Sequence, residues 1–489
     1  MKAWYEKGDF YSRKKGSGLK EKFMEEIYAD FVVIGSGPAG QKGAIQAAKL
    51  GKSVVIIEKY PHPGGSCLHS GTIPSKSLRE AILNLTDYHK KSFYAQYEKG
   101  GHEISINELN FCLSQVTEEQ IKQLNKQFEK NKIRLIQGMA HFENSHQIAV
   151  LDENNHLTHV VVGEKILIAT GSNPRNPKNI PFDKEMVLDS TRLLSIDKVP
   201  KKMIVLGGGI IGSEYASFFA ALGTEVIVVD KKEQILPYLD KEIGMHLQSA
   251  LSKIGLKFVA NKDFEEIKRH KDHVELRFND GTSLTGDVLL YALGRVAHVD
   301  HLHIENVGIT VDSRGHVPVN ALFQTIVPNI YAVGDVIGGP CLASTSMEQG
   351  RLAARHAFGA QTHHFPTFYP IGIYTIPEIS SCGYTEEQLQ MLGFRYEVGR
   401  AYYYEIAKNT ITGNESGLFK ILFHADTLEI LGIHIIGREA TEVIHIGQVA
   451  MTFSAKIDYF IDQVFNYPTY AEGYRIAALN GFNKVKHKR

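Results

Sequence analysis

One pattern that occurs twice along the chain constrains the fold more than any other feature. Each copy is an apolar strand, a glycine-rich turn, an apolar helix and a second strand that ends in an acidic residue. The first copy starts with the strand at 28–34 and turns through Gly35-Ser-Gly37-Pro-Ala-Gly40, and the second starts at 202–206 and turns through Gly207-Gly-Gly209-Ile-Ile-Gly212. Short apolar runs bounded by glycine are typical of parallel strands buried on both faces. Each copy therefore predicts a βαβ unit.

The three glycines of each turn suit a bound dinucleotide. The first permits a tight turn, the second lets the backbone approach a pyrophosphate, and the third allows helix and strand to pack closely, while the helix N-terminus faces the phosphate charge. The returning strands end in Glu58 and Asp230, each 18 residues after the last glycine of its turn. A carboxylate at this position accepts hydrogen bonds from a ribose 2′-hydroxyl. The sequence predicts two separate dinucleotide sites.

The second site is expected to favour NAD, because the carboxylate of Asp230 repels the 2′-phosphate of NADP. Lys231 and Lys232 follow directly. They either offset this repulsion or form a solvated pair at a strand end, and the sequence leaves both interpretations open.

The length and charge of the chain limit the number of domains and the kinds of partner that we expect. The 489 residues are too many for one core and suggest about three domains. Lysine plus arginine and aspartate plus glutamate each total 54, which favours neither nucleic acid nor an anionic membrane as a partner. No apolar run is long enough to span a bilayer and no signal peptide is evident, so a cytoplasmic protein is expected. Residues 1–27, which are polar and charged, are expected to be a flexible extension.

Cysteines and the C-terminal region complete the outline. The four cysteines are too sparse for a disulfide scaffold and lack metal-ligand spacing, so no metal site is expected. From about Phe365 the pattern changes to strands such as 419–423 and 430–436 and a helix from about 440 to 453. This region is expected to be a third, α+β domain that joins subunits.

Three further segments carry a family resemblance. The stretch Gly64-Gly-Ser-Cys67-Leu-His-Ser-Gly-Thr72-Ile-Pro-Ser-Lys76, together with Ala169-Thr-Gly171 and Tyr331-Ala-Val-Gly-Asp335, resembles the two-dinucleotide-binding flavoprotein disulfide reductases. The resemblance covers nearly the whole chain beyond residue 27. It implies an FAD-binding domain over 28–189 and 295–364, an NAD(P)-binding domain over 190–294 and a dimerisation domain over 365–489. The implied fold class is α/β, with two Rossmann-like domains and a C-terminal α+β domain.

The resemblance also implies roles for individual residues. The lysine matching Lys76 lies near flavin N5 and pairs with the glutamate matching Glu214, and the aspartate matching Asp335 binds the ribityl chain of FAD. Backbone amides near Leu342 and Ala343, at a predicted helix start after Pro340, would stabilise negative charge at N1 of the reduced flavin. The expected cofactor-binding residues are Gly35, Gly37, Pro38, Ala39, Gly40, Glu58, Lys59, Gly65, Ser66, Cys67, Thr72, Lys76, Thr170, Gly171, Gly207, Gly209, Ile211, Gly212, Asp230, Gly294, Gly334, Asp335, Leu342 and Ala343.

Two departures from the family pattern carry the functional prediction. A disulfide reductase needs two thiols five positions apart, but Thr72 stands five positions after Cys67. The family's histidine base before a C-terminal proline is replaced by Tyr467, with Glu472 nearby. Both losses fall on thiol–disulfide exchange, while the features that bind FAD and a nicotinamide nucleotide remain.

Together with these two losses, the family resemblance implies reversible hydride transfer between NADH and NADP⁺ through FAD, in a ping-pong cycle. The expected catalytic residues are Lys76, Glu214, Cys67, Tyr467 and Glu472. A homodimer is expected, with larger homo-oligomers open, because in the family each active site is completed by the other chain's C-terminal segment. NAD(P)H and NAD(P)⁺ are the expected small-molecule partners.

Other functions stay in competition at this stage. A diaphorase-like enzyme would use the same FAD and NADH apparatus to reduce quinones or other acceptors. A peroxidase or oxidase would need a reactive thiolate at Cys67, whereas a small packing residue is the favoured interpretation of that cysteine. A nucleotide-sensing binding protein would bind FAD and turn over no acceptor. The preferred nucleotide, the direction of transfer and the redox state of Cys67 are left open.

Overall fold

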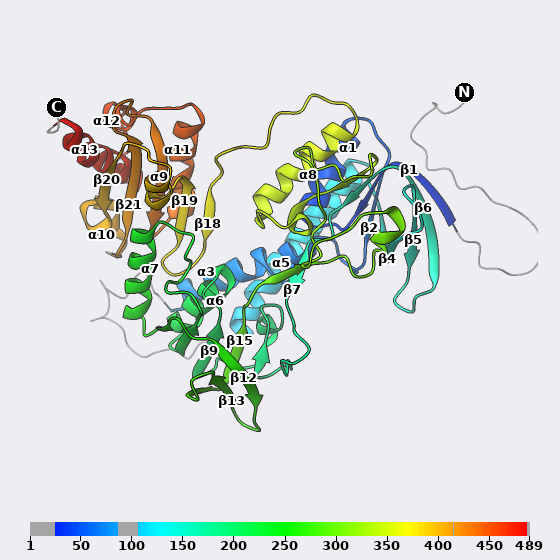
Figure 1. Ribbon diagram of the computed structural model, residues 1–489, viewed down its shortest axis with the longest axis horizontal. Helices are drawn as coiled ribbons and strands as arrows, with labels where there is room; N and C mark the ends of the chain where they lie inside the picture. Colours follow the sequence, from blue (N-terminus) through cyan, green and yellow to red (C-terminus); the bar gives the residue numbers. More distant parts are fainter. Residues whose placement is uncertain (1–24, 87–105, 414, 487–489) are drawn as a thin grey trace, which may run out of the picture. The chain divides into compact units, whose positions relative to one another are not determined.

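The computed structural model describes residues 25–86, 106–413 and 415–486. The chain divides into two compact units. The first comprises Met1–Pro74, Leu113–Arg175 and Gly294–Phe365, and the second comprises Ser75–Cys112, Asn176–Leu293 and Pro366–Arg489. The α/β class with two Rossmann-like domains and a C-terminal α+β domain is confirmed, whereas the domain boundaries given above stay predictions. Figure 1 shows the elements of each unit.

A sheet with strand order β3-β2-β1-β6-β5-β4 forms the framework of the first unit, and β17 pairs with β6 off this path. The strands β1, β2, β3, β6 and β17 run parallel to their neighbours, while β4 and β5 add an antiparallel extension. Their bounds are β1 Glu25–Ile34, β2 Val54–Glu58, β3 Arg134–Gln137, β4 Met139–Phe142, β5 Gln147–Leu151, β6 Leu157–Ile168 and β17 Ile330–Ala332.

The first strand begins earlier than the sequence indicated. Ordered structure was expected from Tyr28 and an extension over 1–27, but β1 starts at Glu25, and its backbone pairs with His159 of β6 there. Backbone ladder bonds form without regard to side-chain polarity, so a polar strand end is invisible to a hydrophobicity pattern. Residues 1–24 lie outside the described residues.

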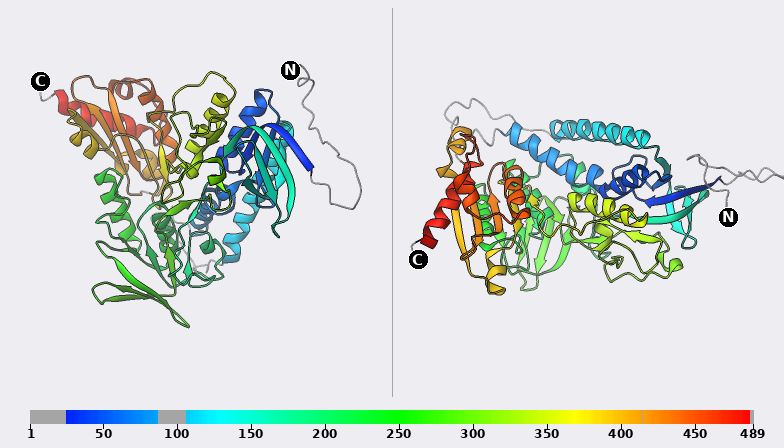
Figure 2. Two further views of the ribbon diagram at one scale, coloured as in Figure 1. Left: turned by 45° about the vertical axis from the view of Figure 1, so that its right-hand side comes forward. Right: turned by 90° about the horizontal axis from the view of Figure 1, so that it is seen from above.

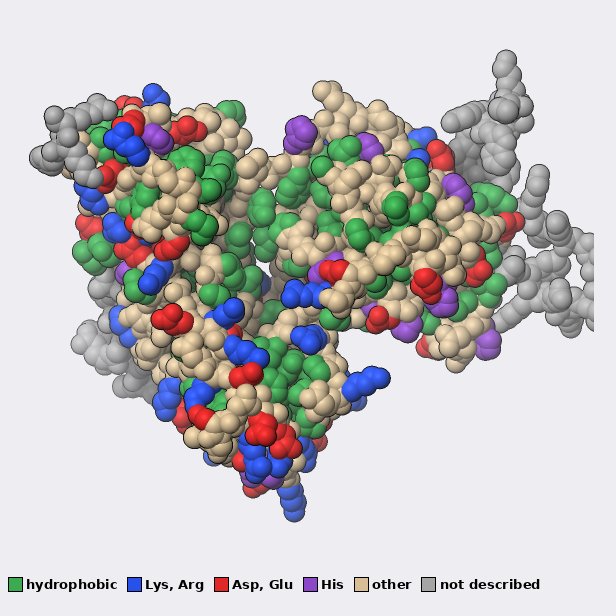
Figure 3. Space-filling view, viewed as in Figure 1, with side chains coloured by type: hydrophobic (Ala, Val, Ile, Leu, Met, Phe, Trp, Pro, Cys, Tyr) green, Lys and Arg blue, Asp and Glu red, His purple; other side chains and the backbone are tan. Residues whose placement is uncertain are grey.

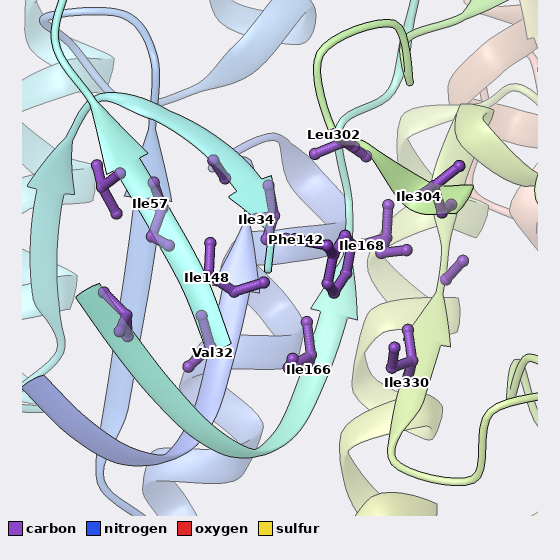
Figure 4. Packing of buried hydrophobic residues seen from close by; sticks show 14 of the residues in the cluster. Val32, Ile34, Ile57, Phe142, Ile148, Ile166, Ile168, Leu302, Ile304 and Ile330 are labelled. Carbon is purple, nitrogen blue, oxygen red and sulfur yellow. The ribbon is translucent and has the colours of Figure 1, made fainter. Parts of the chain in front are cut away.

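Both faces of this sheet are covered. Phe31 and Val33 pack in one core with α1 (Pro38–Lys49) and α8 (Ala343–Ala357), which lie side by side (Figure 1). Val32 and Ile34 point into the opposite core (Figure 4). The alternation follows from the two-residue period of a strand. The helices α1 and α8 approach so closely that a Cβ added to Gly350 would stand 2.1 Å from the carbonyl oxygen of Ala39.

Shorter elements complete the first unit and lead into the second. The first unit contains β7 (Ser172–Pro174), which pairs with β16 (Arg295–Ala297), the short helix α2 (Gly65–His69) and the 3₁₀ turns η3 (Ile304–Val307) and η4 (Gly334–Ile337). Most of the helix α3 (Thr72–Leu85) belongs to the second unit, and α5 (Ile106–Lys130) contributes residues to both units.

The segment Asn176–Leu293 of the second unit contains the second predicted βαβ pattern. Its parallel sheet has the order β11-β10-β9-β15-β8, and an antiparallel sheet β12-β13-β14 follows. The elements are β8 Val187–Leu188, η2 Arg192–Ser195, β9 Lys202–Leu206, α6 Ile210–Ala221, β10 Glu225–Val229, α7 Lys241–Lys253, β11 Lys257–Val259, β12 Phe264–Arg269, β13 Val274–Phe278, β14 Ser283–Gly286 and β15 Val288–Tyr291.

The C-terminal domain, also in the second unit, is an antiparallel sheet with helices packed against it. The strand order is β18-β19-β22-β21-β20. The last helix packs on β20 and β21 (Figure 2). The elements are β18 Ile371–Ile373, β19 Ile379–Gly383, α9 Glu386–Met391, β20 Tyr396–Tyr402, η5 Tyr403–Glu405, α10 Ala407–Thr412, β21 Leu418–His424, β22 Ile430–Ile436, α11 Ala440–Thr452, α12 Asp458–Asp462 and α13 Glu472–Lys486.

A buried ion cluster links the C-terminal domain to α7. The Nζ atom of Lys420 on β21 lies 2.8 Å from Asp240, 3.0 Å from Glu242 and 2.5 Å from Glu386, and the side chains of Lys420 and Asp240 are 1% and 0% exposed. Burial alone would raise the pKa of Asp240, but His434 and Lys420 hold it below its ordinary value. The C-terminal domain and the start of α7 therefore meet through an ion pair, Lys420 with Asp240, that has almost no access to water.

Acidic and basic side chains are interspersed on the face of the molecule in Figure 3, with no field of one sign. Among the described helices, none is both long enough and apolar enough to cross a bilayer.

Candidate functional site

The two glycine turns have the same local geometry, each in its own unit. A Cβ added to Gly40 would stand 2.0 Å from the carbonyl oxygen of Gly35, and one added to Gly212 would stand 1.9 Å from that of Gly207. By contrast, the space around a Cβ at the middle glycine, Gly37 or Gly209, is open to at least 4 Å. The third glycine of each turn is required for packing, and the second leaves room for a ligand next to the backbone.

The starting glycines also need their conformational freedom. Gly35 has a φ of +98° and Gly207 a φ of +112°, in the left-handed region that favours glycine. The helices α1 and α6 then begin just after the open middle glycines, which have no side chain to cap them. Their first backbone amides are therefore directed at the open space, as binding of a phosphate requires.

In the first unit, Glu58 is held by the turn itself. Its Oε2 accepts hydrogen bonds from the backbone N and the Oγ of Ser36, at 2.9 and 2.5 Å, and its Oε1 accepts one from the backbone N of Tyr60 at 3.0 Å. The backbone N of Gly64 in turn donates to Ser36 Oγ at 2.9 Å. The carboxylate is thus oriented at the end of β2 and joined to the segment that starts α2.

The helix α2 begins against the first turn. A Cβ added to Gly65 would stand 2.8 Å from the Cα of Gly37, so these two backbones touch. Ser66 and Cys67 follow within α2, where Cys67 is half-buried. Thr72 is the first residue of α3, which also carries Lys76.

A second group of residues near the first glycine turn combines positions distant in sequence, since a Cβ added to Gly334 would stand 3.3 Å from the Cβ of Ala39. Asp335 in η4 accepts a hydrogen bond from Ser172 Oγ at 2.6 Å, and Arg295 Nε donates to the same Oγ at 2.8 Å. The backbone N of Gly334 donates to the buried Gln349 at 2.8 Å. The turns at Gly171 and Gly294 have open space around a Cβ. The helix α8 starts at Ala343 with Leu342 as its N-cap.

Thr170 provides an observation about a ligand in the first site. Its Oγ1 is buried and has no hydrogen-bond partner among the described residues. A buried hydroxyl without a partner costs free energy, so a polar group supplied from outside the chain would satisfy it.

Lys59 lies beside this site. Its Nζ is 3.3 Å from Nε2 of His298 and 4.6 Å from the centre of the Tyr60 ring. Burial and the nearby Lys59 ammonium lower the pKa of His298 to about 4, so this imidazole is neutral at pH 7.

In the second unit, the carboxylate of Asp230 accepts a backbone hydrogen bond from its own glycine turn, as the carboxylate of Glu58 does in the first unit. Its Oδ2 accepts from the backbone N of Gly208 at 2.5 Å and its Oδ1 from the backbone N of Lys232 at 2.8 Å. The side chain of Lys231 forms an ion pair with Asp263 at 2.7 Å, and both are well exposed. Lys231 is therefore exposed, as the solvated interpretation expects, but it is paired with a carboxylate that the sequence spacing did not reveal.

The structure brings Lys76 and Glu214 together, although they are 138 residues apart. Lys76 Nζ lies 2.9 and 2.7 Å from the two carboxylate oxygens of Glu214, whose side chain is 5% exposed. The backbone N of Tyr374 also donates to Glu214 Oε1 at 2.9 Å, and the Tyr374 ring centre is 4.8 Å from Lys76 Nζ. Ile211 and Gly212 lie one turn before Glu214 on α6.

The remaining predicted site residues lie at the C-terminal end of the chain. Tyr467 is 72% exposed, and Glu472 is the first residue of α13. One carboxylate oxygen of Glu472 is buried with no hydrogen-bond partner in the described part of the chain. An exposed aromatic and an unsatisfied carboxylate in the same terminal segment suit a surface that another molecule covers.

Sequence reasoning missed the residues that hold the predicted ones in place. They are Ser36, Ser172, Arg295, Gln349 and Tyr374. Ser36 lies inside the first glycine turn and Arg295 directly follows Gly294, so their places next to motif glycines were an available signal. Tyr374 reaches Glu214 only through the tertiary fold, and no spacing rule would have found it.

Comparisons with known proteins agree with this geometry. The family described as pyridine nucleotide-disulphide oxidoreductase matches residues 29–350, and the dimerisation domain of that family matches 369–478. The chain is 43% identical over 457 residues to the soluble pyridine nucleotide transhydrogenase of Mycobacterium bovis (strain BCG / Pasteur 1173P2), covering 94% of this chain and 98% of that protein. It is 41% identical over 460 residues to that of Enterobacter sp. (strain 638), covering 93% and 98%.

Solved structures show the same fold. The HOCl-induced flavoprotein disulfide reductase from Escherichia coli matches with a TM-score of 0.82 and 28% identity, over 92% of this chain and 99% of that one. LpdA from Mycobacterium tuberculosis matches with a TM-score of 0.85 at 24% identity, over 92% and 99%, and at that identity it supports the fold alone.

Proposed function

The chain belongs to the pyridine nucleotide-disulphide oxidoreductase family, and from this premise we propose that it transfers hydride reversibly between NADH and NADP⁺ with FAD as the carrier. The observation that carries the proposal is Thr72 at the position where a disulfide reductase has its second thiol, five residues after Cys67. A dithiol cannot form there, so the hydride that enters from one nucleotide leaves to a second nucleotide instead of to a disulfide. The relatives named soluble pyridine nucleotide transhydrogenase support the same assignment.

The residues of the first unit fit FAD. The open space at Gly37 lies next to uncapped amides of α1, the carboxylate of Glu58 is oriented at the end of β2, and the hydroxyl of Thr170 lacks a partner. Asp335 follows Gly334, which packs against Ala39 of the first turn, and accepts a hydrogen bond from Ser172. When bound, FAD supplies an isoalloxazine ring that accepts a hydride at one step and returns it at another.

The protein's own contribution is binding, orientation and electrostatics. The turn at Gly207–Gly212 would bind the nicotinamide nucleotide, with Asp230 at its ribose. Glu214 holds the ammonium of Lys76 with both oxygens, and in the proposed mechanism this ammonium would supply a fixed positive charge to the reacting ring. The amides at the start of α8, near Leu342 and Ala343, would favour negative charge on the reduced ring.

The assembly and location follow from the same premise. We propose a homodimer, because the dimerisation domain is present and the exposed Tyr467 and the unsatisfied Glu472 lie where the family completes its active site with a second chain. The cytoplasm is the proposed location.

The test is a sequence of two half-reactions without oxygen. The FAD-loaded protein is reduced with one equivalent of NADH, and NADP⁺, a disulfide substrate or a quinone is then added while the flavin absorbance is followed. Reoxidation by NADP⁺ and none by the disulfide is the expected result. Rapid reoxidation by the quinone with none by NADP⁺ would replace the proposal with a diaphorase function. No turnover with any acceptor would leave only a binding role.

A further inference from the structure

Residues 374–378, here called the clasp, follow β18 and contact two helices of the second unit. On α3, Arg79 Nε donates to the carbonyl oxygen of Thr375 at 3.3 Å, and its Nη2 pairs with Glu378 at 3.1 Å. Both Arg79 and Glu378 are buried. Lys76 lies one turn earlier on the same helix, with its ammonium over the ring of Tyr374 at 4.8 Å.

The clasp is also bonded to α6. The backbone N of Tyr374 donates to Glu214 Oε1 at 2.9 Å, and the backbone N of Ile376 donates to the buried Ser217 Oγ at 3.1 Å. Glu214 and Ser217 are three residues apart and so lie on one face of the helix. Two consecutive turns of α6 and two of α3 are therefore joined by one short segment of the C-terminal domain.

We propose that Tyr374 is a positioning residue for Lys76: its ring face holds the ammonium by a cation–π interaction, and its backbone N–H fixes the carboxylate of Glu214 that pairs with that ammonium. The inference rests on the proposed function, which assigns Lys76 to the reacting ring of FAD. It adds a residue of the C-terminal domain to the machinery of hydride transfer.

Physical chemistry explains why a lysine needs such a partner. Its ammonium is a point charge on a flexible four-carbon side chain. A carboxylate that is itself free to rotate attracts this ammonium without fixing its position. Because Glu214 Oε1 already accepts from Tyr374, the carboxylate cannot rotate without losing that hydrogen bond in a nearly dry environment. The ring adds a second attraction through its quadrupole. Burial raises the pKa of Tyr374, so the phenol remains neutral at pH 7.

The sharpest test changes the ring electrostatics without changing its shape. Phenylalanine and its mono-, di- and trifluorinated analogues are incorporated at position 374 of the full chain, and each FAD-loaded protein is mixed with NADH without oxygen. Fluorine withdraws charge from the ring face, so the rate constant of flavin reduction should fall steadily along the series. The visible absorbance maximum of bound FAD should shift in the same order, which gives a readout independent of turnover.

Ordinary substitutions at position 374 complement the fluorinated series. Tyr374→Phe keeps the ring and should hold the rate within about twofold, whereas Tyr374→Leu should lower it about tenfold, the effect expected of losing one partly desolvated cation–π contact. Tyr384→Leu is the matched control, because Tyr384 is another half-buried tyrosine of the C-terminal domain, and its ring packs on Phe368 and Phe394. It should leave rate and spectrum unchanged.

Equal rates and spectra along the fluorinated series would overturn the proposal, as would a Tyr374→Leu protein that matches the wild type. The fluorinated series conserves the shape of the ring, so it still tests the proposal if the Tyr374→Leu protein fails to fold. The readout uses only the NADH half-reaction. If NADP⁺ fails to reoxidise the wild type, the proposed function falls while the role of Tyr374 is still measured.

Discussion

The same substitution at two glycines of the second turn should have opposite effects. In Gly212→Ala, the new methyl would stand 1.9 Å from the carbonyl oxygen of Gly207, about 1.5 Å inside an ordinary contact. Since the obstacle is backbone, the strand and helix must separate. Overpacking of this kind costs about 1–3 kcal/mol, which corresponds to a fall in melting temperature of about 2–10 °C.

In Gly209→Ala, the methyl would enter open space, and the backbone at φ −76° is one that alanine adopts freely. The fold should be unchanged or up to about 1 kcal/mol more stable, because alanine has less freedom to lose on folding. The methyl would, however, occupy the space where the backbone approaches the pyrophosphate. The dissociation constant of NADH should rise at least about tenfold, equivalent to about 1.4 kcal/mol.

Melting curves of the FAD-loaded variants and titration with NADH separate the two effects. The reasoning about the turn is refuted if Gly209→Ala binds NADH as the wild type does, or if Gly212→Ala melts at the wild-type temperature. The corresponding pair in the first turn, Gly37 and Gly40, serves as the control, because alanine there should impair FAD retention and leave NADH affinity unchanged.

Two further predictions concern charges in the second unit. Asp263→Asn should raise the preference for NADPH over NADH, measured as a ratio of kcat/KM values, by about two- to fivefold, because Lys231 would be free to pair with the 2′-phosphate of NADPH. Asp280→Asn, which removes the partner of Lys262, is the matched control. An unchanged ratio in Asp263→Asn would show that Asp263 does not influence the choice of nucleotide. Lys420→Met should cost about 3–5 kcal/mol in urea denaturation, because it leaves buried carboxylates without their cation. In the folded state the pKa values of Asp240 and Glu242 lie below their ordinary values. The stabilisation of the fold by these two carboxylates is therefore fully present above the unfolded pKa of ~4 and is lost as the pH falls through the folded pKa. The wild-type midpoint should therefore fall in acid, and a midpoint constant from pH 7 to 3 would contradict the cluster's role.

Local sequence was enough to predict the two βαβ units, because strand, turn and helix signals all lie within about thirty residues of one another. The helix starting at Ala343 and the one starting at Ala440 were also visible in the sequence, the first from its place after Pro340. The strand end at Glu25 was not, because its stability comes from pairing with His159.

The candidate site shows the same division. The places of the motif glycines in the turns, and of Glu58 and Asp230 at the strand ends, could be predicted from spacing alone, while their roles as ligands stay predictions. Their supporting partners could not, since Asp335 depends on Ser172 and Lys76 on Tyr374, pairs whose separation in the chain exceeds 160 residues. The sequence left open whether Lys231 offsets the charge of Asp230 or is solvated, and only the fold revealed Asp263 beside it.

The contact between α1 and α8 has a consequence for the order of biosynthesis. The two helices pack backbone to backbone through Gly350, yet the whole segment Asn176–Leu293, which belongs to the second unit, is translated between them. At about 5–20 residues per second, the ribosome needs roughly 10–40 s to pass from Arg175 to the end of α8. Until Ile330–Ala332 has been translated, β6 lacks its partner β17, and until α8 follows, α1 lacks the helix that packs against it. The second glycine turn is complete in the emerging chain before the first unit can close.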